Sequence, residues 1–167
     1  MELSDRHRRF FLVEQGAIPA LFNLVLNGAI AWALFRTASG VPLWGESSVG
    51  VDLLATAFLL PFLTCVIVSA LVAREVEAGK VDPLPEAQRS HSRWVARSPS
   101  RRGLFLGAAV ILFGALPLVW ALHLGAARPF PVGSFIAFKA LWAAMLAFLV
   151  TPVIAWWALS APRPGGV

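Results

Sequence analysis

The side chains best able to do chemistry in this chain are polar groups inside long apolar stretches. Gln15, Asn23 and Asn27 fall within the apolar stretch 10–35, and Asn23 and Asn27 are four residues apart. Residues at this spacing share one face of a helix, so the amides predict a polar stripe. Because amides in hydrocarbon need partners, the stripe either lines a path for a solute or water, or bonds hydroxyl groups of the next apolar stretch. Those hydroxyl groups belong to Thr56, Thr64 and Ser69.

Two opposite charges form a second candidate site. Asp52 begins the second apolar stretch, and Lys139 is the only charged residue of the fourth, 135–159. An unpaired charge within a membrane costs ~2.5–3.5 kcal/mol on insertion scales, so each charge gains from a partner. We expect an ion pair that ties the two halves of the chain together. A site for a solute or a proton is one alternative, and two independent side chains that reach the membrane surface are another.

No pattern of a catalytic, metal or cofactor site stands out in the sequence. The spacing of His, Cys and carboxylate residues does not fit zinc, and no glycine-rich loop of the phosphate-binding kind is present. The single cysteine, Cys65, lies inside an apolar stretch, which excludes an intrachain disulfide. We therefore predict no cofactor and no enzymatic activity.

Four apolar stretches must position these residues. They cover 10–35, 53–73, 104–124 and 135–159, and each exceeds the ~20 residues that a helix needs to cross a bilayer. The first is also too long for the ~7–15 apolar residues of a secretory signal, so we interpret it as an uncleaved span. With 58% hydrophobic and 14% charged residues, the composition is unlike that of soluble domains. The sequence predicts an all-α integral membrane protein, a four-transmembrane-helix bundle that forms a single domain over 1–167.

The distribution of basic residues predicts the orientation. Eleven of the 14 Lys and Arg residues lie before the first stretch, in the loop 74–103 or after the fourth stretch. The other two loops hold two, and the remaining one is Lys139 within the fourth stretch. Basic residues gather on the cytoplasmic side of membrane proteins, so we expect both termini and the basic loop 74–103 to be cytoplasmic. The net charge of +5 then favours contact with anionic lipid headgroups at that face over nucleic-acid binding.

Small residues at seven-residue spacing predict close helix packing in the third and fourth stretches. Small side chains let helix backbones approach in lipid, where hydrophobicity does not draw helices together. We expect these two stretches to pack against each other through these residues, with a dimer interface as the alternative. The residues are Gly103, Gly107, Gly114 and Ala121 in the third stretch, and Ala137, Ala144, Thr151 and Ala158 in the fourth, beside a second row of Ala140, Ala147 and Ile154.

The two halves of the chain share features at an offset of about 87 to 89 residues. Each half would be one helical hairpin, and both hairpins would begin on the same side of the membrane. This arrangement fits parallel repeats related by an axis along the membrane normal. Unrelated membrane hairpins also carry Trp at the membrane interface and Pro in turns, so the duplication is a hypothesis. The matching pairs include Trp32 with Trp120, Pro42 with Pro129, Asp52 with Lys139, and Thr64 with Thr151.

Three functions fit this pattern. The first is a small permeation or transport bundle, supported by the amide stripe, the two charges, and Pro61, Pro117 and Pro152 within the stretches. Four helices enclose little volume, so this function calls for a homo-oligomer. The second is a structural or accessory subunit of a larger membrane complex, supported by the small-residue seams and the lack of visible chemistry. A small lipid-modifying membrane enzyme is the third.

Overall fold

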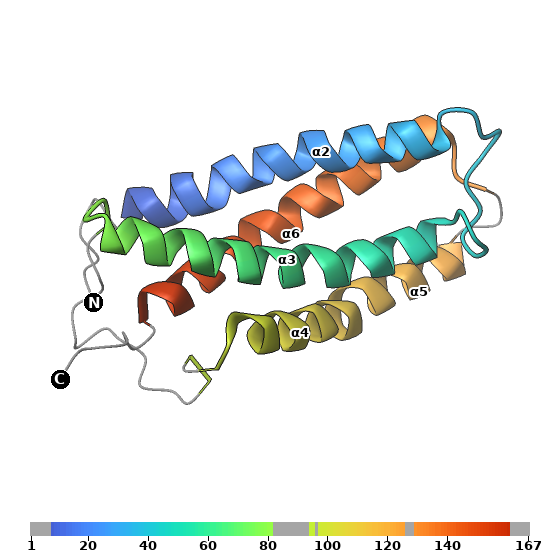
Figure 1. Ribbon diagram of the computed structural model, residues 1–167. Coiled ribbons are helices and arrows are strands. Elements are labelled where there is room, and N and C mark those ends of the chain that lie inside the picture. The colour runs from blue at the N-terminus through green and yellow to red at the C-terminus, as the bar shows by residue number, and fades with distance from the viewer. Residues whose placement is uncertain (1–7, 82–93, 96, 126–128, 161–167) are drawn as a thin grey trace.

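The chain forms a bundle of long helices (Figure 1). The computed structural model describes residues 8–81, 94–95, 97–125 and 129–160. Four helices are long and apolar enough to cross a membrane, and the residues described contain no strand. The prediction of an all-helical protein with four such helices is therefore confirmed. Their bounds are Phe10–Phe35, Val49–Glu77, Pro99–Gly125 and Val132–Ser160.

Two of these helices contain a segment of π-helix. The first begins as η1 (Phe10–Ala17) and continues as α2 (Ile18–Phe35). The third consists of α4 (Pro99–Val110), η3 (Ile111–Ala115) and α5 (Leu116–Gly125). A π-helix takes the wider i→i+5 hydrogen bond, as the N–H of Leu116 does to the carbonyl of Ile111.

The other two helices, α3 (Val49–Glu77) and α6 (Val132–Ser160), are unbroken and 29 residues long. They run beyond the predicted limits 53–73 and 135–159. At the start of α3, the Ser48 hydroxyl accepts a hydrogen bond from the N–H of Val51 at 3.4 Å, which caps the helix. Polar residues continue the helical hydrogen bonds past the apolar stretch, so hydropathy alone places the helix ends too far inward.

The central pair of the bundle is α3 with α6. The helix α2 packs against α6 on one flank, and α4 packs against α3 on the other (Figure 1). The largest apolar core lies toward one end of this arrangement and includes Leu53, Val119, Phe135 and Trp142.

The two ends of the bundle differ. At one end, Val41 and Phe130 from the two connecting segments form a β-bridge, with N···O distances of 2.9 and 2.8 Å. We call this the bridge end, and we call the opposite end, where η1 begins and α6 ends, the Arg8 end. Part of the predicted basic loop 74–103, namely 82–93 and 96, lies outside the residues described.

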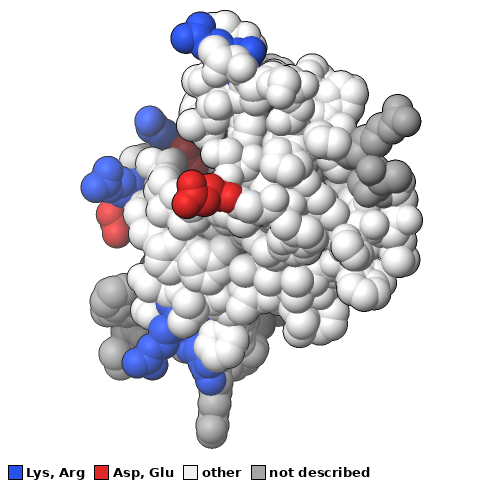
Figure 2. All heavy atoms as spheres, turned by 90° about the vertical axis from the view of Figure 1, so that its right-hand side faces the viewer, with Lys and Arg blue, Asp and Glu red and all other residues white. Residues whose placement is uncertain are grey.

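Large apolar side chains cover much of the outer surface. Phe113 is 78% exposed, and Val25 and Leu141 are each 64% exposed. Seen from the bridge end, the surface is largely uncharged, with a few separate charged groups (Figure 2). Apolar exposure of this extent is unusual in soluble monomers. Together with the four long helices, it is consistent with a multi-pass membrane protein.

Candidate functional site

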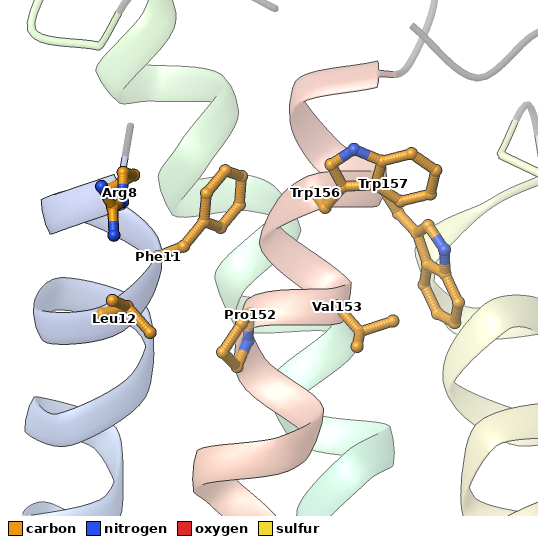
Figure 3. A pocket seen from close by; sticks show the side chains of 7 residues that line it. All are labelled: Arg8, Phe11, Leu12, Pro152, Val153, Trp156 and Trp157. Atoms are coloured by element: carbon orange, nitrogen blue, oxygen red, sulfur yellow. The ribbon is translucent and has the colours of Figure 1, made fainter. Parts of the chain in front are cut away.

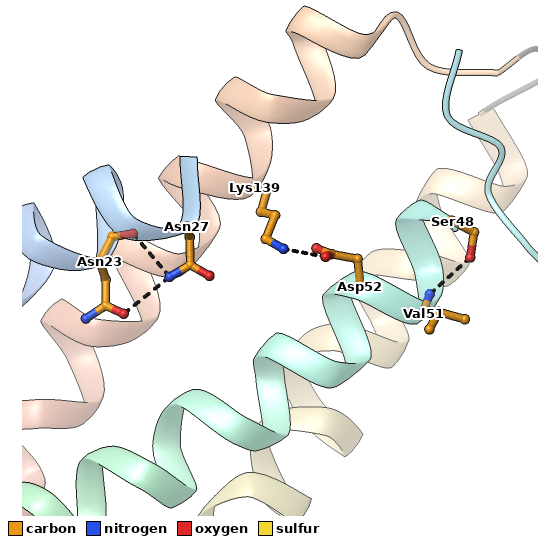
Figure 4. A network of polar contacts seen from close by, with 6 residues as sticks. All are labelled: Asn23, Asn27, Ser48, Val51, Asp52 and Lys139. Carbon is orange, nitrogen blue, oxygen red and sulfur yellow. Dashed lines mark hydrogen bonds and ion pairs between the residues drawn. The ribbon is translucent and has the colours of Figure 1, made fainter. Parts of the chain in front are cut away.

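The predicted charge partners meet inside the bundle. Lys139 of α6 donates a hydrogen bond to Oδ1 of Asp52, which lies in the first turn of α3 (Figure 4). Their side chains are only 4% and 13% exposed. The other carboxylate oxygen of Asp52, Oδ2, is buried and accepts no hydrogen bond from the residues described. The contact ties the central helices together and leaves one buried carboxylate oxygen without a donor among the residues described.

The asparagine amides bond to their own helix. Asn23 Nδ2 donates to the carbonyl of Pro19 at 2.9 Å. Asn27 Nδ2 donates to the carbonyl of Asn23 at 3.2 Å and to its Oδ1 at 3.3 Å (Figure 4). The alternative in which they bond hydroxyl groups of the second apolar stretch is not what the structure shows. The amides therefore do not join α2 to α3 directly.

Both candidate sites open into one groove between α2 and α3, with a volume of about 430 Å³. The asparagines contribute from α2, Asp52 from α3, and Lys139 from α6. Thr56 and Thr64 also line the groove, which is otherwise apolar. Gln15, the third member of the predicted stripe, is half-buried in η1 and is not among the lining residues. The apolar walls are Phe22, Leu26, Ile30 and Leu34 from α2, and Ala55, Leu59, Leu60, Leu63 and Ile67 from α3.

The α3 wall of this groove includes a small side chain. Ala55 lies on the α3 wall, and Trp142 of α6 follows it by the same 87 residues that separate Asp52 from Lys139. On the opposite flank the Trp142 indole approaches Gly114, where an added Cβ would lie 3.5 Å from it. An indole of α6 thus packs on that flank, whereas position 55 of α3 carries only a methyl group.

The glycines of the third helix pack against a different partner than expected. A Cβ added at Gly103 would lie 3.0 Å from the Phe62 carbonyl, and one at Gly107 would lie 2.9 Å from the Phe58 carbonyl. Both contacts are with α3, so the expected packing of these glycines on the fourth helix is wrong. The spacing of small residues shows that backbones approach closely, but it does not identify the neighbour. Further along, Gly114 does face α6, while Ala121 is exposed.

Small residues of the fourth helix meet α2. A Cβ added at Gly28 of α2 would lie 3.4 Å from the Cβ of Ala140. Ala140 belongs to the second row of small residues, which is buried along its length. The first row is divided among environments and forms no continuous seam. In that row Ala137 is exposed, Ala144 and Ala158 are half-buried, and Thr151 is buried.

A buried arginine was not expected from the sequence. Arg102, counted there among the loop cations, lies in the first turns of α4 and is 3% exposed. Its Nη2 donates to the hydroxyl of Ser69 at 3.4 Å, while Nε and Nη1 have no hydrogen-bond acceptor among the residues described. The sequence Ser98-Pro99 is a common helix start and is the signal that could have placed Arg102 on a helix.

The described ranges contain no group of three His, Cys, Asp or Glu side chains able to hold a metal ion. The site is therefore defined by its groove, its amides and its ion pair. No protein-family model matches this chain, and no curated protein or solved structure shows significant similarity to it.

Proposed function

We propose that this protein is a small membrane transport bundle and that the groove between α2 and α3 binds its solute. The observation that carries the proposal is the convergence of Asn23, Asn27, Asp52 and Lys139 on one groove from three helices. Polar and ionisable side chains within apolar helices are costly, and in membrane proteins they mark substrate and ion pathways.

The groove favours an amphipathic solute. Its volume of about 430 Å³ lies within the usual ~300–1,000 Å³ of small-molecule sites. Its apolar walls suit a hydrocarbon or aromatic body. The amides provide hydrogen-bonding groups for a polar group of the solute, and Asp52 and Lys139 line the same groove. Exposed residues such as Phe22 and Leu63 form its rim, so the open side of the groove is also apolar.

A second copy of the chain completes this proposal. The groove is bounded by α2 and α3 and floored by α6, and its remaining side faces outward. A route across the membrane needs a wall on that side. We therefore infer a homo-oligomer in which a second subunit covers the groove.

The packing order also supports a duplicated hairpin. The contact of α2 with α6 corresponds to that of α4 with α3 when the two halves are exchanged. Under the same exchange, Asp52 and Lys139 pair across the central helices, and Val41 pairs with Phe130 at the bridge end. If the halves are repeats, Ala55 of α3 corresponds to Trp142 of α6. The smaller side chain at position 55 would then leave room for a solute on that flank.

The orientation is part of the proposal. We place the Arg8 end in the cytoplasm, because the predicted cytoplasmic segments carry most of the Lys and Arg residues. Asp52 and Lys139 would then lie nearer the far side, and the groove would extend from them toward the membrane centre.

The direct test fills the groove. Ala55→Trp places an indole where α3 lines the groove, and Ala70→Trp places one on an exposed part of the same helix outside it. Proteoliposomes would be assayed for uptake of ethidium, an amphipathic cation, and of anilinonaphthalene sulfonate, an amphipathic anion. Uptake of at least one probe should exceed that of empty vesicles, disappear in Ala55→Trp and persist in Ala70→Trp. Equal uptake by the two variants and the wild type would overturn the assignment of the groove.

A structural or accessory subunit is the second candidate. The observation that favours it is the apolar rim of the same groove, where Phe22 is 63% exposed and Leu59 is 50% exposed. A helix of another membrane protein could cover this rim. Purified size in mild detergent separates the candidates, because a discrete homo-oligomer fits the transport bundle and an unstable monomer fits a missing partner.

A further inference from the structure

A second groove lies at the Arg8 end, between η1 and α6. Its volume is about 470 Å³, and Figure 3 shows the side chains that line it. Phe11 and Leu12 line it from η1, and Pro152, Val153, Trp156 and Trp157 line it from α6. It shares no lining residue with the groove between α2 and α3. The two are therefore separate sites.

Among the residues described, Arg8 is the only charged one that lines this second groove. It is exposed, and it forms no ion pair or hydrogen bond with any residue that the structure describes. A cation with no such partner, placed at one end of an apolar groove, attracts an anion attached to an apolar group. A free phosphate or other soluble anion would gain nothing from the apolar walls.

The walls change in character along the groove. Trp156 and Trp157 lie in the last turns of α6, and Pro152 and Val153 lie about one turn deeper. Tryptophan is enriched at the level of the lipid headgroups, and the deeper residues are wholly apolar. Pro152 lies inside α6, has no backbone N–H, and lines the groove together with residues of η1.

From these features we infer that the groove binds one anionic phospholipid, with its phosphate at Arg8 and an acyl chain along Pro152 and Val153. The indole rings of Trp156 and Trp157 would lie at the level of the glycerol backbone. The bound lipid would fill the space between η1 and α6 and hold the first helix against the bundle at this end. The inference does not depend on the proposed function, because the site needs only the membrane that surrounds it.

Native mass spectrometry of the full chain tests the lipid site. The protein would be purified from an equimolar mixture of phosphatidylglycerol and phosphatidylcholine, and the retained lipids counted. The wild type should retain phosphatidylglycerol in preference. Arg8→Gln should lower the preference by about fivefold, the effect of one basic residue near an anionic headgroup. Arg9→Gln is the matched control, because Arg9 is exposed, adjacent and absent from the groove.

A second pair of variants tests the acyl-chain part of the site. Val153→Trp should fill the groove and reduce retention of both lipids, whereas Leu149→Trp, exposed on the same helix outside the groove, should not. Equal retention of the two lipids by the wild type would overturn the inference. An equal effect of Arg8→Gln and Arg9→Gln would also overturn it, because the lipid preference would then arise from the basic surface as a whole and not from this groove.

Discussion

Lys139 in α6 contacts Asp52 in α3, where neither side chain is more than 13% exposed. The pair joins the two central helices and borders the groove that holds Asn23 and Asn27. One contact therefore has two consequences: it stabilises the bundle, and it fixes the charges that a solute would meet.

A double-mutant cycle tests the structural consequence. Asp52→Asn leaves the Lys139 ammonium buried without its partner, and Lys139→Met leaves the Asp52 carboxylate in the same state. Each change should lower the free energy of unfolding in detergent, by about 3 kcal/mol for a fully buried charge. Asp52→Asn should cost more, because Lys139 is the less exposed of the two. The double variant should be less destabilised than the sum by ~0.5 kcal/mol or more. Simple additivity would mean that the two residues do not interact.

The packing of the third helix predicts opposite effects at two glycines. Gly107→Ala should destabilise the protein by about 1–3 kcal/mol, because its Cβ would lie 2.9 Å from backbone and ring atoms of Phe58. Gly114→Ala is the control on the same helix, since its Cβ would make an ordinary contact of 3.5 Å. It should be neutral or slightly stabilising. Thermal unfolding in detergent measures both, and equal melting temperatures would contradict the close approach of α4 to α3.

The proposed orientation predicts where reporters become accessible. A reporter fused after Val167 and one inserted near Gln88 should both be cytoplasmic, while one near Ser47 should lie on the far side. The reason is the concentration of Lys and Arg in the N-terminal, loop and C-terminal segments. An external reporter at Gln88 would reverse the whole orientation.

The four helices could be predicted from sequence because apolar runs of about 20 or more residues with few charges are typical of membrane-spanning helices and rare elsewhere. Pairing of Asp52 with Lys139 could also be anticipated, since charges are scarce within these runs and each is costly alone. The helix neighbours could not. Gly107 indicates a close approach to some backbone, but only the packing of all four helices decides that the partner is Phe58 of α3.

The groove could not be predicted for a related reason. Its α3 wall includes the small side chain of Ala55, and alanine is common on both buried and exposed helix faces, so it does not mark a groove in the sequence. The spacing of the asparagines predicts a polar stripe but does not predict their hydrogen bonds to their own helix. The burial of Arg102 was missed because a cation beside a basic loop ordinarily remains in solvent.

The asparagine groove provides the most direct test of the transport proposal. Asn23→Leu with Asn27→Leu keeps a similar side-chain volume and removes both amides. Because the amides bond only within α2, the double variant should stay folded with a melting temperature close to that of the wild type. Its uptake of the ethidium or anilinonaphthalene sulfonate that the wild type carries should fall about tenfold, the effect of losing two hydrogen bonds of ~0.6–1 kcal/mol each. Wild-type uptake indistinguishable from that of empty vesicles for both probes would contradict the transport proposal, and unchanged uptake in the double variant would contradict the role of the amides.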